Sequence, residues 1–425
     1  MKLAVLTQYY PPEIGAPQAR LSNLARAFAA RGHQVTVLTA MPNYPTGKIH
    51  EGYRGAWMRE ERDGAMVVRT FLYPTQRTDF AHRLTSYYSF ALSSVLWGTF
   101  YLEPPDYLLV ESPPLFLGVA GVWLSWLKRT RLIFNVSDLW PDSPVRLGLL
   151  QRGSFAFRVG AALEGFCYRH AWLVTGQARD IVADITARYP SCPTFHLSNG
   201  VDTSVFAPER ATEAARAILH RDGECVAVYA GLHGLAQGLD VLVDAADALP
   251  GDSNLDLVLL GDGPEKVAIT GRVRDRRVPH VRLLDPRPHG EIPAILAAAD
   301  VVIVPLWRHL PGAVPSKLYE ALASGRPVIL MAEGEAAEIV RRNDAGIVVP
   351  PGNVTELVGA LRMLALNAPL RRRFGANGRA AAVKYFDRSQ IAAGFIDMLE
   401  QRLGAGGGAN PSGRMRAAVT SRPQP

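Results

Sequence analysis

The sequence has little cysteine, three residues among 425, with an odd count and no C-x-x-C spacing. The three are Cys167, Cys192 and Cys225. Such a scattered set predicts neither a disulfide framework nor a thiolate zinc site, and it favours a reducing, cytoplasmic compartment. A long apolar leader is also lacking, because Pro11 and Pro12 soon follow the short apolar run from Lys2 to Thr7. We therefore expect folding to begin at residue 1.

Several motifs of common enzyme classes are absent. No D-x-D sequence occurs, so a carboxylate-held metal is not indicated. No G-x-G-x-x-G opens the first predicted helix, which argues against a dinucleotide site, and neither a G-x-x-x-x-G-K-[ST] loop nor a G-x-S-x-G turn is present. The ten histidines lack metal-ligand spacing. We expect no metal and no bound cofactor.

Charge gives no sign of a nucleic-acid partner. The formal net charge is +7, but three arginines belong to an acid-free C-terminal tail, which leaves +4 for the rest. This bias is too mild for a nucleic-acid footprint. With 48% hydrophobic residues, the chain has enough apolar material for two ordinary domains.

The first half opens with a βαβ pattern. The apolar run from Lys2 to Thr7 predicts a strand, the periodicity from Pro17 to Arg31 predicts a helix, and Gln34 to Ala40 predicts a second buried strand. Gly32 is suited to the left-handed position after the helix. The alternation is typical of a Rossmann-like α/β domain.

The same alternation returns after residue 205. The predicted strands are Cys225 to Ala230, Leu255 to Leu260, Val281 to Leu284, Val301 to Val304 and Pro327 to Met331. We therefore expect two doubly wound parallel-sheet domains, 1–204 and 205–387, that face each other across a cleft. A last amphipathic helix, 388–403, is expected to cross back to the first domain, and the Gly- and Pro-rich tail 404–425 is expected to be disordered.

Two apolar segments interrupt the pattern of an ordinary soluble domain. Leu84 to Leu102 has no charge over 19 residues and is rich in aromatic side chains. Because this segment lies inside the first domain and contains Ser and Thr, we expect a buried or interfacial helix and not a membrane span. Leu115 to Leu127 ends in the basic run Lys128 to Arg131, which suits an anionic membrane surface. Two ordinary core helices are the alternative.

The start of one predicted helix in the second half is a candidate anion site. Ser316 is a typical N-cap and Gly325 a typical helix terminator, which predicts a helix from Lys317 to Ser324. The free backbone N–H groups and the helix dipole favour an anion there, and Lys317 adds a positive charge.

Glu320 lies three residues after Lys317, on the same face of this helix. Lys317 is therefore a candidate to stabilise a diphosphate while Glu320 binds ribose hydroxyls, with Ser316 and Leu318 as further donor-binding candidates in the same turn. An ordinary i, i+3 salt bridge between Lys317 and Glu320 is the alternative.

Glycine-rich loops follow the predicted strands of both halves. Gly261 and Gly263 follow one strand, and the segment from Gly231 to Gln237 follows another. Gly15 precedes the first helix of the chain in the matching position. Such loops let the backbone approach a ligand, so these five residues are assigned to donor binding, although a lone G-x-G is common in surface turns.

An ordered set of motifs resembles family 4 glycosyltransferases of the GT-B fold, over about residues 1 to 400. The segments that carry the resemblance end at Arg20 (GAPQAR), Thr39 (RGHQVTVLT), Asp142 (NVSDLWPD), Asp202 (NGVD), Glu265 (GDGPE), Glu320 (PSKLYE) and Gly352 (GIVVPPG). The chain is most similar to the bacterial subgroup that builds O-antigen and colanic acid, often named fucosyl- or N-acetylfucosaminyltransferases.

The resemblance implies transfer of a sugar from a nucleotide diphosphate donor, with a UDP-sugar favoured over a GDP-sugar. It implies a polyprenyl-diphosphate-linked saccharide as acceptor, retention at the anomeric carbon, and no metal. The place of action would be the inner face of the cytoplasmic membrane, with peripheral attachment. A nonhydrolysing sugar-nucleotide epimerase and a catalytically silent sugar-nucleotide binder are the alternatives.

The family's motifs also carry over to single positions. Glu320 matches the second glutamate of the family's E-x7-E motif, which binds the ribose, but the first glutamate falls at Gly312. The family's Arg and Lys after the first strand of the second domain fall at Leu232 and Gln237. Lys317 is expected to replace their charge.

The acceptor side is less well defined. The family's histidine in the first domain has no counterpart in the segment VESPP, residues 110–114. Asp138 and Glu13 follow predicted strands and are candidates to orient the acceptor hydroxyl. Either side chain could instead cap a local turn.

Overall fold

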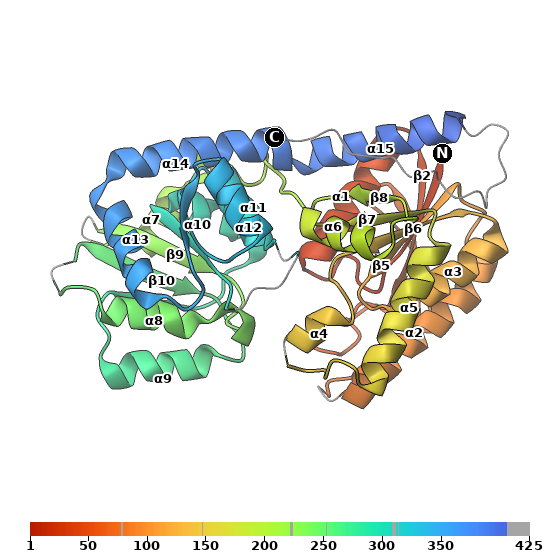
Figure 1. The fold of residues 1–425 in the computed structure, drawn as a ribbon, viewed down its shortest axis with the longest axis horizontal. Helices are drawn as coiled ribbons and strands as arrows, with labels where there is room; N and C mark the ends of the chain where they lie inside the picture. Colours follow the sequence, from red (N-terminus) through yellow and green to blue (C-terminus); the bar gives the residue numbers. More distant parts are fainter. Residues whose placement is uncertain are drawn as a thin grey trace. The chain divides into compact units, whose positions relative to one another are not determined.

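The computed structural model describes residues 1–77, 80–146, 148–221, 224–251, 253–307, 312 and 314–405. The chain divides into two compact units. The first contains Met1–Asn199 together with the chain from Arg388 onward, and the second contains Gly200–Asp387 (Figure 1). This division lies a few residues before the boundary expected near residue 205.

The first unit is built on an eight-stranded sheet in the order β3-β4-β2-β1-β5-β6-β7-β8. Its strands are β1 (Lys2–Leu6), β2 (Gln34–Ala40), β3 (Trp57–Arg62), β4 (Ala65–Thr70), β5 (Tyr107–Ser112), β6 (Arg131–Val136), β7 (Leu173–Gly176) and β8 (Thr194–His196). All adjacent strands pair in parallel except β3, which pairs antiparallel with β4 at the edge. The strand order reverses between β1 and β5, where α/β sheets bind ligands at the carboxyl ends of the strands.

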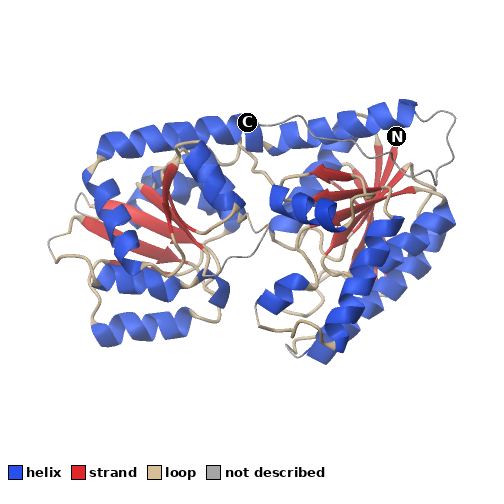
Figure 2. Cartoon of the chain, viewed as in Figure 1, coloured by secondary structure: helices blue, strands red, loops and turns tan. Residues whose placement is uncertain are grey.

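Helices cover both faces of this sheet (Figure 2). They are α1 (Ala16–Ala30), α2 (Phe80–Tyr101), α3 (Phe116–Lys128), α4 (Asp142–Arg146), α5 (Phe155–His170), α6 (Arg179–Arg188) and α15 (Arg388–Ala405). Successive residues of a buried strand point to opposite faces, which fixes the layers. On β5, Leu109 joins the core that includes α1 and α15, and Val110 packs under Gly121 of α3.

The second unit contains a six-stranded parallel sheet in the order β11-β10-β9-β12-β13-β14. Its strands are β9 (Cys225–Ala230), β10 (Leu255–Leu260), β11 (Val281–Leu284), β12 (Val301–Pro305), β13 (Val328–Met331) and β14 (Gly346–Val349). The first three have the predicted bounds. The order reverses between β9 and β12, so the loops after these strands lie at the topological switch point.

The helices of the second unit alternate with its strands. They are α7 (Glu213–Leu219), α8 (Leu239–Asp247), α9 (Lys266–Arg276), α10 (Ile292–Ala298), α11 (Ser316–Ala323), α12 (Glu335–Arg342), α13 (Val354–Leu366) and α14 (Ala368–Ala381). One large cluster of buried aliphatic side chains from the sheet and from α8 and α13 forms the core. Two doubly wound α/β units are thus present, as the sequence predicts.

The last helix belongs to the first unit. Phe395 of α15 is buried against Phe28 of α1, with the ring centroids 6.5 Å apart. The helix runs from Arg388 to Ala405, two residues beyond the predicted end. Gly404 and Ala405 are therefore helical, and the rest of the expected disordered tail, 406–425, lies outside the described residues.

The two apolar segments form α2 and α3, which pack against each other and against the sheet. Gly98 of α2 faces Leu38 and Leu124, but the opposite side of α2 carries exposed apolar side chains. Leu92 is 73% exposed and Phe100 is 70% exposed. These segments are therefore only in part core helices. In the part of the chain that the structure describes, no helix has the length and apolarity needed to cross a bilayer.

Candidate active site

Three glycine-containing loop positions meet at the switch point of the second unit. Gly231 follows β9, and Gly261 and Gly263 follow β10. Their φ angles are +148°, +149° and +154°, which side chains with a Cβ rarely adopt. A Cβ at Gly261 would lie 1.9 Å from the Gly231 carbonyl oxygen, so the two loops touch backbone to backbone. The structure thus brings together the two predicted glycine loops of the second unit.

Lys317, from the first turn of α11, extends over the loop after β9. A Cβ at Gly231 would lie 2.1 Å from its Cε atom, and its Nζ atom lies 5.4 Å from the centre of the Tyr229 ring. Burial lowers the pKa of Lys317, and the neighbouring Glu320 carboxylate raises it in part. Among the described residues, no ion pair joins Lys317 to Glu320 or to another carboxylate. The salt-bridge alternative therefore does not describe this pair, and the ammonium is available to an anion.

The start of α11 lacks the side-chain cap that the sequence suggested. The N-cap residue is Pro315, and Ser316 is the first helical residue, without a capping hydrogen bond from its side chain. The assignment of Ser316 as N-cap was wrong because the preceding proline already holds the extended conformation that this position needs. The Leu318 N–H donates to the Pro315 carbonyl oxygen at 3.0 Å. Gly325 ends the helix with φ +66°, as predicted.

A buried histidine that the sequence analysis did not single out lies between these loops. The His233 ring is fully buried, and neither ring nitrogen has a hydrogen-bond partner within the described part of the structure. A Cβ at Gly261 would lie 3.1 Å from Nε2. Burial lowers the pKa of His233, Lys266 and Lys317 lower it further, and Asp262 and the nearby Leu260 carbonyl raise it in part. The ring is therefore neutral at neutral pH and retains unused hydrogen-bonding capacity beside Lys317.

Gln237 ends a short 3₁₀ turn, Leu235–Gln237, after β9. Its Oε1 atom is buried without a partner among the described residues. The next residue, Gly238, has φ +58° and packs against Trp307, which follows β12 and is 41% exposed. The loops after β9 and β12 thus meet around Trp307, whose exposed indole face is suited to stacking.

The acceptor-side candidates lie in the first unit, in different surroundings. Glu13 is buried, and its carboxylate accepts backbone N–H groups from Tyr10, Asn43 and Tyr44 at 3.2, 2.8 and 2.8 Å. Burial raises its pKa, and these N–H groups lower it in part. The Glu13 carboxylate thus joins the loop after β1 to the loop after β2. The structure therefore favours the capping alternative for Glu13.

Asp138 follows β6 and is half-buried. Its carboxylate accepts hydrogen bonds from the Ser143 hydroxyl and the Leu139 N–H. Burial raises the pKa of Asp138 above its usual value. A partly exposed carboxyl of raised pKa suits a proton acceptor, and this role stays a prediction. Gly15 is the N-cap of α1 with φ 171°, an extended conformation open to any residue.

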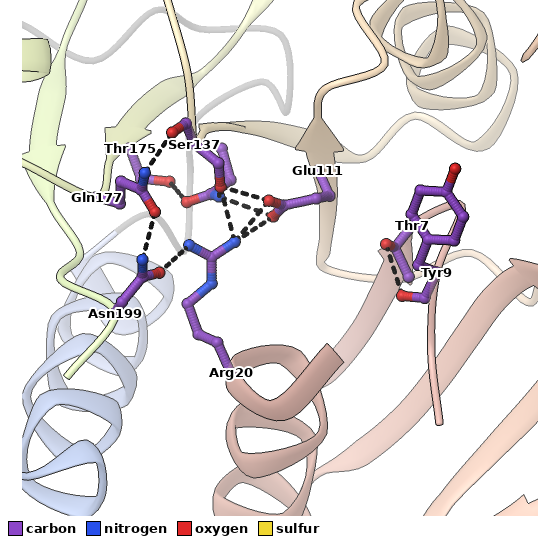
Figure 3. Close-up of polar contacts among 9 residues, drawn as sticks. Thr7, Tyr9, Arg20, Glu111, Ser137, Thr175, Gln177 and Asn199 are labelled. Carbon is purple, nitrogen blue, oxygen red and sulfur yellow. Dashed lines mark hydrogen bonds and ion pairs between the residues drawn. The ribbon is translucent and has the colours of Figure 1, made fainter. Parts of the chain in front are cut away.

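A buried polar cluster fills the carboxyl ends of β5, β6 and β7 (Figure 3). The Arg20 Nη2 atom donates to both Glu111 oxygens at 2.6 Å, and Nη1 donates to Asn199 at 2.6 Å. The side chains of Arg20 and Glu111 are 6% and 3% exposed. Asn135 also donates to Glu111, at 2.8 Å. Glu111 lies in the segment where the family's histidine has no counterpart. Its carboxylate is therefore occupied by hydrogen bonds within this cluster.

Comparison with known proteins assigns both units. Residues 15–193 match the family model described as "Glycosyl transferase 4-like domain", and residues 211–381 match "Glycosyl transferases group 1". A GDP-mannose-dependent alpha-(1-6)-phosphatidylinositol monomannoside mannosyltransferase of Mycobacterium tuberculosis is 30% identical over 305 residues, 64% of this chain and 78% of that protein. The chain belongs to the family 4 glycosyltransferases of the GT-B fold.

Other proteins are similar to this glycosyltransferase over nearly its whole length. A protein of Escherichia coli K12 named as a colanic acid biosynthesis glycosyl transferase, WcaI, is 26% identical over 421 residues, 93% of this chain and 99% of the relative. The sucrose-phosphate synthase of Thermosynechococcus elongatus has the same fold, with a TM-score of 0.74 and 19% identity. The match covers 95% of this chain and 99% of the synthase. Anabaena HepE, solved with UDP and glucose, also has this fold. Its TM-score is 0.69 and its identity 19%, over 94% of this chain and 100% of HepE.

One departure of this glycosyltransferase from the family motifs has a local structural reason. Gly312, where the first glutamate of E-x7-E falls, is buried with φ +76°, so a glutamate would be strained there. Leu232, at the position of the family's arginine, is 56% exposed. Among the described residues, basic groups beside the glycine loops include Lys317, Lys266, whose Nζ atom donates to the Gly261 carbonyl oxygen at 2.9 Å, and, one residue after Leu232, the imidazole of His233.

Proposed function

We propose that this glycosyltransferase transfers a sugar from a UDP-sugar to a polyprenyl-diphosphate-linked saccharide in bacterial surface polysaccharide synthesis. We propose retention at the anomeric carbon and no metal requirement, with a fucose- or N-acetylfucosamine-type sugar as the first donor to test. The observation that carries the proposal is the position of Lys317 over Gly231, whose loop contacts that of Gly261 at the switch point of the second unit. A full positive charge next to exposed backbone suits a diphosphate.

The chemistry follows from the charge of the leaving group. When the bond between the anomeric carbon and the diphosphate oxygen breaks, negative charge develops on that oxygen. Lys317 and the N–H groups at the start of α11 stabilise this charge, and Glu320 accepts hydrogen bonds from the ribose. In a transfer on one face of the sugar, the leaving oxygen accepts the proton of the acceptor hydroxyl, so no side-chain base is required.

His233 joins this set as a second group for the diphosphate. Its Nε2 atom lies beside Gly261 and has no hydrogen-bond partner among the described residues, and an imidazole can donate a hydrogen bond to a phosphoryl oxygen. This contact replaces part of what the family's arginine supplies. The bound diphosphate would in turn favour protonation of His233.

The exposed face of α2, α3 and α5 supports attachment to the inner face of the cytoplasmic membrane. We call this surface the apolar face. It is formed by Tyr88, Leu92, Leu96, Phe100, Trp123, Trp126, Leu127, Phe155 and Val159, all exposed. The three helices contain one acidic residue, Glu164, which is buried and paired with Arg188.

The exposed charged groups on these three helices are therefore basic. Lys128 and Arg129 end α3, and Arg158 and Arg169 lie on α5. Exposed aromatic and aliphatic side chains with flanking cations are suited to an anionic lipid surface, where the side chains enter the interface and the cations meet phosphate groups.

The deciding experiment is an assay with a panel of UDP- and GDP-sugars and a lipid-linked saccharide acceptor. Both nucleotides are included because HepE, which has the same fold, was solved with UDP, whereas the mannosyltransferase relative is GDP-mannose-dependent. Transfer dependent on acceptor supports the proposal. Interconversion of donor without acceptor would indicate an epimerase instead, and nucleotide binding without turnover or donor hydrolysis would indicate a silent binder.

A further inference from the structure

An open groove of about 540 Å³ lies in the first unit, at the carboxyl end of its sheet. Two loops form it, one after β2 and one after β4, together with the first turn of α2. The loops are held in close contact, because a Cβ at Gly47, which has φ +72°, would lie 2.0 Å from the Thr75 carbonyl oxygen. The shape of the groove is therefore fixed by the backbone contact between the two loops.

Basic side chains line this groove. Lys48 comes from the first loop, Arg77 from the second and His82 from α2. None of the described residues that line it is acidic. Arg77 Nη1 lies 3.3 Å from His82 Nε2, and because a guanidinium can only donate, the imidazole nitrogen accepts. His82 thus orients Arg77, and Lys48 and Arg77 supply the positive charge.

The groove lies at the start of α2, a helix that carries part of the apolar face. His82 precedes Phe100 by 18 residues, five turns of an α-helix, so both lie on the same side of α2. The loop after β4 is tied to that side, since the Ser89 hydroxyl accepts the Tyr73 N–H at 2.7 Å. Phe71 and Tyr73 on this loop are 46% and 40% exposed. An apolar surface therefore leads from α2 to the edge of the groove.

We propose that this groove binds the diphosphate that joins the saccharide to the polyprenyl chain of the acceptor. Lys48 and Arg77 contact the phosphoryl oxygens, and the lipid leaves along the apolar face into the membrane. The assignment of the acceptor rests on the proposed function. The basic chemistry would also suit the phosphate of a membrane phospholipid, so the experiment must separate these two sources.

The test combines acceptor kinetics with direct binding. Lys48→Ala, Arg77→Ala and the double variant are compared with Arg372→Ala, which removes one exposed positive charge from α14 in the second unit. We expect the double variant to raise KM for the detergent-solubilised lipid-linked acceptor at least tenfold, with the donor KM unchanged. Lys48→Gln repeats the charge removal with a longer polar side chain and guards against a folding defect.

Binding probes separate the two phosphate sources. We expect the Kd for farnesyl diphosphate to rise at least tenfold in the double variant, and binding to phosphatidylglycerol vesicles to change less than twofold. Equal losses for both probes would overturn the acceptor assignment in favour of phospholipid, and no change for farnesyl diphosphate would overturn the site. If the wild type transfers no sugar to any lipid-linked acceptor, the proposed function fails, and the farnesyl diphosphate measurement still decides whether the groove binds diphosphate.

Discussion

The Lys317 ammonium lies 5.4 Å from the centre of the Tyr229 ring, packed over Gly231. Tyr229 is the penultimate residue of β9, next to the switch point. Its hydroxyl donates to the Leu232 carbonyl oxygen at 2.6 Å. The ring therefore holds the loop after β9 and supports Lys317 through its electron-rich face. This arrangement positions a cation over exposed backbone before any ligand binds.

Removal of either charged group from α11 should reduce turnover. We expect Lys317→Ala and Glu320→Ala each to lower kcat/KM at least tenfold, a loss of about 1.4 kcal/mol of transition-state stabilisation. Lys384→Ala is the matched control, because Lys384 also lies over a tyrosine ring, at 4.8 Å, on the exposed surface of the same unit. Wild-type kinetics in both α11 variants would remove this assignment.

Donor binding should take up a proton at His233. Burial and the two nearby ammonium groups lower the pKa of His233, so the free protein holds it neutral, and a bound diphosphate shifts the pKa upward. Affinity for UDP should therefore increase as the pH falls from about 8 toward 6. Calorimetry in buffers of different ionisation enthalpy measures the proton count.

The histidine variants identify the proton acceptor. His233→Asn and His233→Gln should bind UDP about three- to tenfold more weakly, with proton uptake reduced relative to the wild type. The ligand's own ionisation is common to all three proteins and cancels in the comparison. Equal proton uptake in the wild type and both variants would show that His233 does not face the diphosphate.

Much of the fold could be predicted from the sequence, because the central strands are buried on both faces and appear as continuous apolar runs. The edge pair β3 and β4 was not predicted, and no bounds were predicted for β5 to β8 or for β14. Trp57–Arg62 contains four charged residues, and its burial alternates between partial and exposed, so this edge strand lacks the apolar signal of the strands it joins.

The candidate site was predicted only where local sequence determines it. Lys317, Gly261 and Gly263 were found because their roles follow from a helix start and two strand ends. His233 was missed because its significance depends on contact with Gly261, 28 residues later in the chain, and on ring nitrogens that lack a partner among the described residues. A histidine between two glycines directly after a strand was the available signal. The ion pair of Arg20 with Glu111 spans 91 residues and had no local signal.

Glu13 should matter for stability more than for catalysis. Glu13→Ala leaves the N–H groups of Tyr10, Asn43 and Tyr44 without their acceptor, so we expect the free energy of unfolding to fall by about 3 kcal/mol. Denaturant titration measures this change. The acceptor KM of the remaining folded enzyme should stay within twofold of the wild type, whereas a large rise in KM without loss of stability would restore Glu13 as an acceptor-orienting residue.

His196 should make the first unit sensitive to acid. Burial, helped by Arg179, lowers its pKa to about 4, from an ordinary value near 6.5. Between these values the unfolded chain binds the proton and the folded chain does not, so stability falls as the pH drops from about 6.5 to 4, by about 3 kcal/mol in total. His196→Asn should flatten this slope. His289→Asn, a change at an exposed histidine, should leave it unaltered.

Charges placed on the apolar face should release the protein from membranes. Leu92→Glu with Phe100→Glu introduces two carboxylates where we expect apolar side chains to enter the lipid interface, which should weaken binding to vesicles containing phosphatidylglycerol at least tenfold. Leu366→Glu is the control, since Leu366 is 84% exposed on α13 of the second unit. High salt should release part of the wild type, because screening weakens the contribution of Lys128 and Arg129 but not apolar insertion. Unchanged cosedimentation of the double variant would show that another surface holds the membrane.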